Sequence, residues 1–223
     1  MNRLLLAISV SVGMLITGCA FMPSSSPTEH EENPGFLENY SILRPVPSES
    51  GIKAWRYINP QFTHHEYTSV IVQKVTIYEN SGQNEISQST IDNSKKFVSD
   101  FTKQHLQEHQ FKIVSDTGPK VASVEMIVSG AEIEPKTWRL RKIIPVSDAL
   151  AIAKGSKAKE DDSAIVLEIG TKAIDAQSGL LVGASFVSVP AEAFIDKSGN
   201  HNAFQDALKP WISLSLDNFV ESR

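Results

Sequence analysis

The chain has 223 residues, of which 41% are hydrophobic and 21% charged, so it is long and apolar enough to form one domain with a sizeable core. Its net charge of -5 argues against a protein that binds nucleic acid over its whole surface. The single cysteine, Cys19, excludes an intramolecular disulfide.

The first 18 residues have the features of a lipoprotein signal peptide. Arg3 gives a positive start, and residues 4–16 form an apolar run that is too short to span a bilayer as a stable helix. The run ends in Ile-Thr-Gly followed by Cys19, which resembles the lipobox of bacterial lipoproteins. We therefore predict that residues 1–18 are removed and that Cys19 is acylated. An ordinary secretory signal with an incidental cysteine is the alternative.

Acylation of Cys19 would hold the protein at a membrane without a membrane-spanning helix. Ala20 stands where an aspartate commonly retains lipoproteins in the inner membrane, so we predict the periplasmic side of the outer membrane of a Gram-negative bacterium. Residues 19–35 are rich in serine, proline and glutamate, and we interpret them as a flexible tether. A coil of about 15 residues spans roughly 20 Å, so the folded part would work close to the membrane.

The remaining sequence divides into an aromatic-rich segment and a domain. Residues 36–66 carry many aromatic side chains without a sustained period, and we predict an ordered extension that packs onto the domain. Residues 67–223 form the predicted globular domain. In chain order we predict a strand at 69–78, a helix at 89–110, strands at 111–115 and 121–133, a short helix at 148–154, strands at 163–173 and 180–189, and a helix at 202–221.

The order of these elements predicts an α+β fold. We expect a mixed, largely antiparallel sheet of about five strands, with two long helices packed mainly on one face. Asp175 and Gly179 suit a tight turn between the last two strands, because aspartate can bond the turn backbone and glycine can take a positive φ.

Three short motifs and a late tryptophan stand out in the sequence: GFLENYSIL at residues 35–43, IIPVSDALA at 143–151, IVLEIGTKAIDAQSGLLVGA at 165–184, and Trp211. Together they resemble a family of bacterial lipoproteins known as domain-of-unknown-function family 3313 (DUF3313). The charged insert at residues 154–162 departs from the family pattern. The resemblance implies a periplasmic lipoprotein and implies no particular chemistry.

The sequence HLQEH at residues 105–109 raises the question of a zinc site. On a helix, His105 and His109 fall one turn apart, and Glu108 could act on a zinc-bound water. His105 lies on the same side of the helix as Val98 and Phe101, the side that we expect to be packed, and no later segment signals a third ligand. We therefore interpret the motif as structural and expect neither a metal nor another cofactor. A zinc-dependent hydrolase that uses His105, Glu108 and His109 is the alternative.

The sequence KTWRLRK at residues 136–142 is the one basic cluster. Its members are Lys136, Trp138, Arg139, Arg141 and Lys142. In an extended segment Arg139 and Arg141 would share a face, and the cluster could bind an acidic partner or anionic lipid headgroups. The alternative is a solvated edge whose charges prevent aggregation between strands.

Taken together, these patterns favour a non-enzymatic lipoprotein anchored to the outer membrane, with a folded part that binds another protein of the cell envelope. A module that binds envelope lipid or glycan is a further alternative. We expect no nucleic-acid partner.

Overall fold

The computed structural model describes residues 36–47, 52–62, 67–79, 87–134, 139–157, 163–197 and 200–220. The predicted signal peptide and tether, with Cys19, lie outside these residues, as do Lys136 and Trp138. None of the helices in the described ranges is long and apolar enough to cross a bilayer.

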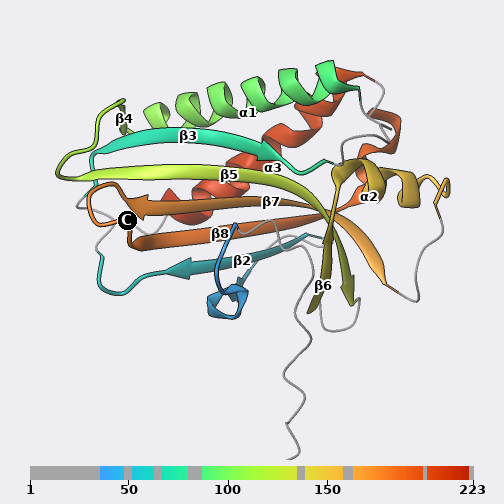
Figure 1. Ribbon diagram of the computed structural model, residues 1–223, viewed down its shortest axis with the longest axis horizontal. Helices are drawn as coiled ribbons and strands as arrows, with labels where there is room; N and C mark the ends of the chain where they lie inside the picture. The colour runs from blue at the N-terminus through green and yellow to red at the C-terminus, as the bar shows by residue number, and fades with distance from the viewer. Residues whose placement is uncertain are drawn as a thin grey trace, which may run out of the picture. The chain divides into compact units, whose positions relative to one another are not determined.

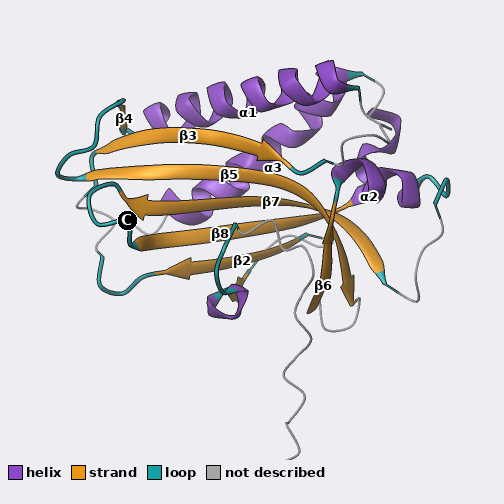
Figure 2. Cartoon of the chain, in the orientation of Figure 1, coloured by secondary structure: helices purple, strands orange, loops and turns teal. Residues whose placement is uncertain are grey.

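The fold is α+β, with one mixed sheet and two long helices (Figures 1 and 2). The helices are α1 (Gln88–Glu108), α2 (Val146–Ala153) and α3 (His201–Val220), with short 3-10 helices at Tyr40–Ile42 and Ala191–Lys197. The strands are β1 (Arg44–Val46), β2 (Lys53–Ile58), β3 (Ser69–Ile77), β4 (Lys112–Ile113), β5 (Val121–Glu134), β6 (Arg139–Ile144), β7 (Ala164–Asp175) and β8 (Leu181–Pro190).

The sheet has eight strands in the order β1-β2-β8-β7-β5-β3-β4, and β6 pairs with β5 beside this path. Strand β3 is parallel to both β4 and β5, and every other pair is antiparallel. The mixed, largely antiparallel class is therefore confirmed, whereas the predicted count of about five strands is wrong. The additional strands come from the aromatic segment, which supplies β1 and β2, and from the basic cluster, which supplies β6.

Side chains cap the first turns of both long helices. The Ser87 oxygen accepts from the Thr90 N–H at the start of α1. The side chain of Asn200 accepts the N–H groups of Asn202 and Ala203 at the start of α3. Helix α3 continues through Pro210 as one element. In β3 the register with β5 shifts between Val72 and Val75.

Successive residues of β7 point to opposite faces of the sheet, and different segments of the chain cover the two faces. Leu167 and Ile169 are fully buried in the main core together with Leu208 and Ile212 of α3. On the other side, Phe36 and Tyr40 pack on Phe186 of β8, with ring centroids 5.7 Å and 5.3 Å away. Since both faces are covered, β7 is buried along most of its length instead of alternating between buried and exposed residues.

A carboxyl group is buried on the second of these faces. Glu168 of β7 is 5% exposed and accepts a hydrogen bond from the Ser188 hydroxyl at 3.0 Å. Burial raises the pKa of Glu168 from 4.5 to about 7. Burial and the nearby Glu168 charge raise the pKa of Tyr40 to about 12. The segment around Tyr40 therefore covers a group that is sensitive to pH near neutrality.

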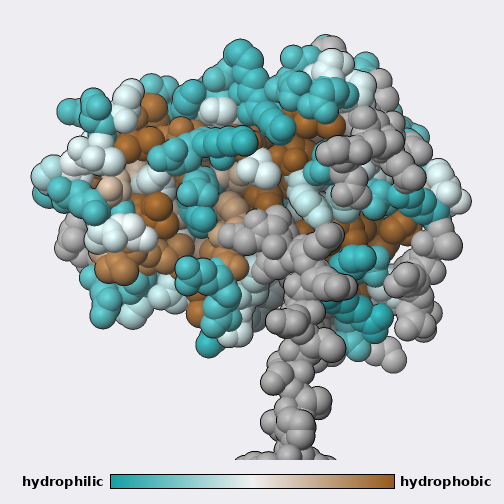
Figure 3. All heavy atoms as spheres, viewed as in Figure 1, coloured by the Kyte–Doolittle hydropathy of each residue, from teal (hydrophilic) through white to brown (hydrophobic). Residues whose placement is uncertain are grey.

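The outer surface is mixed in character. Figure 3 shows polar residues along the top of the view, where α1 lies, and apolar patches interrupted by polar ones in front of the sheet. Among the described side chains, the exposed large hydrophobic residue is Leu180, beside the turn between β7 and β8.

The turn between β7 and β8 has the geometry that the sequence predicts. The Asp175 Oδ1 atom accepts hydrogen bonds from the backbone and the hydroxyl of Ser178, both at 2.7 Å, and the backbone bond is the main cause of a lowered pKa at Asp175. Tyr67 donates its hydroxyl to Asp175 Oδ2 at 3.0 Å. Gly179 has a φ of +73°, and no heavy atom lies within 4 Å of the place where a Cβ would be. Glycine is therefore required here for its backbone conformation and not for lack of space.

Replacing Gly179 with alanine should lower the free energy of unfolding by about 1–2 kcal/mol, because an L side chain is strained at a positive φ. Gly118→Ala is the matched control, since a Cβ there meets only Val121 at 3.8 Å and φ is not positive. Urea unfolding of both variants measures the difference. Equal effects at the two positions would contradict the assignment of the strain to Gly179.

Replacing Glu168 with glutamine should change how stability depends on pH. The folded pKa lies above the unfolded value, so wild-type stability should fall as pH rises from about 4.5 to about 7, where the buried group ionises. Glutamine stays neutral, so the unfolding free energy of the variant minus that of the wild type should grow across this window, by on the order of 3 kcal/mol. Glu192→Gln, at an exposed carboxylate, is the control. Urea unfolding at several pH values measures both, and a difference for Glu168→Gln that stays flat with pH would refute the effect.

Candidate functional site

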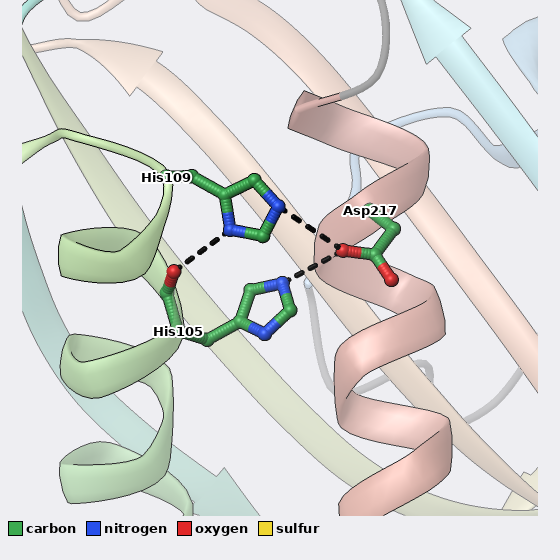
Figure 4. Close-up of polar contacts among 3 residues, drawn as sticks. All are labelled: His105, His109 and Asp217. Atoms are coloured by element: carbon green, nitrogen blue, oxygen red, sulfur yellow. Dashed lines mark hydrogen bonds and ion pairs between the residues drawn. The ribbon is translucent and has the colours of Figure 1, made fainter.

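The two histidines of HLQEH lie one turn apart at the end of α1. His105 is buried with a relative exposure of 9%, while His109 follows the last residue of the helix and is half-buried. Their ring centroids are 4.5 Å apart, and Figure 4 shows both rings directed toward α3. The side of α1 that carries His105 is therefore packed, as expected, and the ring itself meets a second helix.

The side chain that meets both rings is Asp217, in the last turns of α3 (Figure 4). Its Oδ1 atom lies 2.7 Å from His105 Nε2 and 3.9 Å from His109 Nε2. The three residues form a group whose nitrogen and oxygen ligand atoms all lie within 4.8 Å of one another. The structure thus supplies a third potential ligand, which no sequence motif had indicated.

The position of Asp217 follows from how α1 and α3 pack. Lys209 lies over the Phe97 ring, with its Nζ atom 5.6 Å from the centroid, and Asp217 lies at His105. From the first contact to the second, α1 and α3 each move forward by eight residues, so the two helices run in the same direction. Asp217 stands next to the buried Leu216, at the border of the apolar stripe of α3. A polar residue at that border signals a surface position and gives no indication of its partner.

A backbone carbonyl orients the second histidine. His109 Nδ1 lies 2.9 Å from the carbonyl oxygen of His105, an acceptor, so Nδ1 must carry the proton. In the neutral ring, Nε2 then keeps its lone pair on the side of Asp217. His105 Nε2 lies 2.7 Å from the Asp217 carboxylate and is the donor of the hydrogen bond between them.

Glu108 does not take part in this group. Its carboxylate is exposed and accepts a hydrogen bond from Gln104 Nε2 at 2.9 Å. The residues that the structure assembles are therefore His105, His109 and Asp217, in place of the set His105, Glu108 and His109.

A groove of about 690 Å³ runs between the same two helices. It is lined by α1 side chains between Asn93 and Gln104 and by α3 side chains between Asn202 and Lys209. Its lining combines Phe97 and Phe101, which stack with centroids 5.8 Å apart, with polar side chains. The groove is open, and its α1 wall ends one residue before His105.

The basic cluster forms a strand beside an acidic end of β5. In the hairpin, Arg139 stands opposite Glu134, and Lys142 stands opposite Glu132. The register shifts between Glu132 and Ile133, so Arg141 is an extra residue and the expected alternation of Arg139 and Arg141 is interrupted. Arg141 and Lys142 are both exposed. Two positions of the cluster, Lys136 and Trp138, lie outside the described residues.

The relatives found by sequence are lipoproteins without an assigned role. The Uncharacterized lipoprotein YdcL of Escherichia coli (strain K12) is 24% identical over 148 residues, which is 66% of this chain and 64% of the relative. The protein of the same name from E. coli O157:H7 gives the same values. The aligned region thus spans less than two thirds of the relatives' own length.

Solved structures show only distant likeness. A PelC dodecamer from Paraburkholderia phytofirmans matches with a TM-score of 0.31 and 10% identity, over 71% of this chain and 96% of that chain. A DUF4136 family protein from Bacteroides thetaiotaomicron matches with a TM-score of 0.38 and 8% identity, over 78% of this chain and 100% of the other. These TM-scores are too low to support an argument about this protein.

A family match covers most of the chain. Residues 32–213 match the family described as Protein of unknown function (DUF3313), which confirms the resemblance seen in the short motifs. The matched region contains all the strands, most of α3, and both histidines of the cluster, but it ends before Asp217. On this match, the chain belongs to the protein family of unknown function DUF3313.

Proposed function

We propose that this protein is a lipoprotein anchored to the periplasmic side of the outer membrane, and that its folded part is a non-enzymatic accessory module that binds another protein of the cell envelope. The observation that carries the proposal is the apolar run that ends in Ile-Thr-Gly before the single cysteine, Cys19. The relatives that are named as lipoproteins support it.

The arrangement of the chain suits a module that works at the membrane surface. Two or more acyl chains at Cys19 give stable anchoring, and a tether of about 15 residues keeps the fold within roughly 20 Å on average. The family match begins at residue 32, so the sequence between Cys19 and the matched region is short. The partner would then bind close to the membrane surface.

Strand β6 is the surface that we assign to the partner. In the described part of the sheet it pairs with β5 alone, and an edge strand of this kind can pair with a second molecule. Arg141 and Lys142 are exposed on this strand, and Glu132 of β5 stands opposite Lys142. Exposed positive charge on an edge strand favours an acidic partner surface and increases the rate of association. Binding to anionic lipid or to glycan is the alternative that the test below separates.

The alternative of a zinc-dependent hydrolase receives less support. Glu108, its general base, is exposed and hydrogen-bonded to Gln104, and Asp217 occupies the place next to the two histidines. A carboxylate that stands 2.7 Å from His105 Nε2 binds the imidazole and is not positioned as a base toward a free substrate.

Replacing Cys19 with alanine should abolish lipid attachment. The wild type should incorporate radiolabelled palmitate and sediment with outer membranes, whereas the variant should carry no label. Ala20→Asp is the matched variant: it should keep the label and move the protein toward the inner-membrane fraction. Label in the Cys19→Ala variant would show that the anchor is elsewhere, and an unchanged fraction for Ala20→Asp would refute the proposed sorting.

Replacing Arg141 and Lys142 together with glutamine should leave folding intact, because surface substitutions usually change stability by less than about 0.5 kcal/mol each. Glutamine is preferred to glutamate, which would place a like charge opposite Glu132. Cross-linking in intact cells should lose the partner of the wild type. Lys74→Gln with Lys112→Gln, two exposed lysines on β3 and β4, gives a control with the same net charge. If both double variants lost the cross-linked partner to the same extent, the partner would not be binding specifically to β6. Loss of binding to anionic vesicles, with protein cross-links unchanged, would favour the lipid alternative.

A further inference from the structure

We propose that His105, His109 and Asp217 form a binding site for one divalent transition-metal ion of the Zn²⁺ class, and that the ion cross-links the ends of α1 and α3. This inference does not depend on the function proposed above. It rests on three donor atoms from two helices that converge on one point, each held by the fold in a suitable orientation (Figure 4).

The donor set selects the class of ion. Two imidazole nitrogens and one carboxylate oxygen suit Zn²⁺ and the neighbouring divalent transition metals, whereas Mg²⁺ and Ca²⁺ prefer sites made entirely of oxygen. A histidine pair at four-residue spacing on one helix presents both rings to the same ion. Three protein ligands leave at least one coordination position for water.

The distances are close to those of an occupied site. For metal–ligand bonds of 2.0–2.1 Å in a tetrahedral site, neighbouring ligand atoms lie about 3.4 Å apart. The two distances from Asp217 Oδ1, 2.7 Å to His105 Nε2 and 3.9 Å to His109 Nε2, lie on either side of this value. Both distances lie within about 1 Å of this value, and all three ligand atoms lie within 4.8 Å of one another.

The surroundings of the rings favour metal binding through both Nε2 atoms. The carbonyl oxygen of His105 holds the proton of His109 on Nδ1, which is the orientation that a ligating histidine usually receives from its second contact. At His105 the proton that now lies between Nε2 and Asp217 must leave, and the neutral ring then carries its proton on Nδ1. Since both rings must be neutral to bind, the affinity should weaken as pH falls.

The cluster is also accessible from one side. The His105 side chain is 10% exposed, whereas His109 and Asp217 are 36% and 32% exposed. An ion can therefore enter past His109 and Asp217 and reach a ligand that is fixed in the helix interface. Occupancy would join two helices that are far apart in the sequence and would stabilise the folded chain by mass action.

The alternative is that the cluster is only a hydrogen bond between helices. Two variants separate this from a metal site. His109→Ala removes one ligand and leaves the bond between His105 and Asp217 in place. Asp217→Asn keeps an oxygen that can accept from His105 but removes the charged ligand. Glu108→Ala, at the exposed neighbour outside the cluster, is the matched control.

The test is calorimetric titration of the purified full-length protein, without an affinity tag, with ZnSO₄, combined with thermal unfolding and with MgCl₂ as a control salt. The wild type and Glu108→Ala should bind one Zn²⁺ per chain and melt at a higher temperature with Zn²⁺ but not with Mg²⁺. His109→Ala and Asp217→Asn should fold, bind Zn²⁺ at least about 100-fold more weakly, and lose the shift. Co²⁺ in place of Zn²⁺ should give the absorption spectrum of a low-coordinate site in the wild type and in Glu108→Ala, but not in His109→Ala or Asp217→Asn. The absence of stoichiometric Zn²⁺ binding by the wild type would overturn the proposal. Unchanged binding in His109→Ala would do the same, because the ion would then be held by histidines outside the cluster.

Discussion

Strand β5 hydrogen-bonds along one edge to β7 over most of its length, and along the other edge first to β3 and then to β6. It is 14 residues long and nearly all of it is buried. A strand in this position must be covered on both faces, because any uncovered face would leave apolar side chains in water. Helices α1 and α3 cover one face, and the segment around Phe36 and Tyr40 covers part of the other. Close approach at glycine is part of this packing: a Cβ at Gly130 would lie 2.6 Å from the Cβ of Ala149 in α2.

The long, regular elements could be predicted from the sequence because their signal is local. The helical spacing of Val98, Phe101 and His105, the apolar-rich sequences of β5 and β7, and the residues of the turn at Asp175 each lie within one local segment. Strands β1, β2 and β6 were missed, since they are short and acquire their pairing from distant segments. Trp55 of β2, for example, is opposite Phe186 of β8, and no local pattern in the sequence predicts that these two residues pair.

For the same reason, the sequence predicts the two histidines of the candidate site but not its aspartate. The pair His105 and His109 is visible as a spacing within one helix, whereas Asp217 reaches it only through the parallel packing of α1 and α3. That packing depends on which face of the sheet the two helices share, and a single sequence does not specify it. Glu168 likewise follows a run of apolar residues, and its burial beneath Tyr40 depends on the path of residues 36–46 over the sheet.

The features with functional meaning lie at separate parts of the chain. The proposed anchor is at Cys19, the proposed partner surface is at β6, and the histidine cluster lies between α1 and α3. The proposed anchoring matters most, because it decides which molecules the other two surfaces can meet. Mass spectrometry of the protein purified from membranes tests it. We expect a chain that begins at Cys19, with a mass increased by a diacylglyceryl group and an amide-linked acyl chain. A chain that begins at another residue, or an unmodified thiol at Cys19, would contradict it.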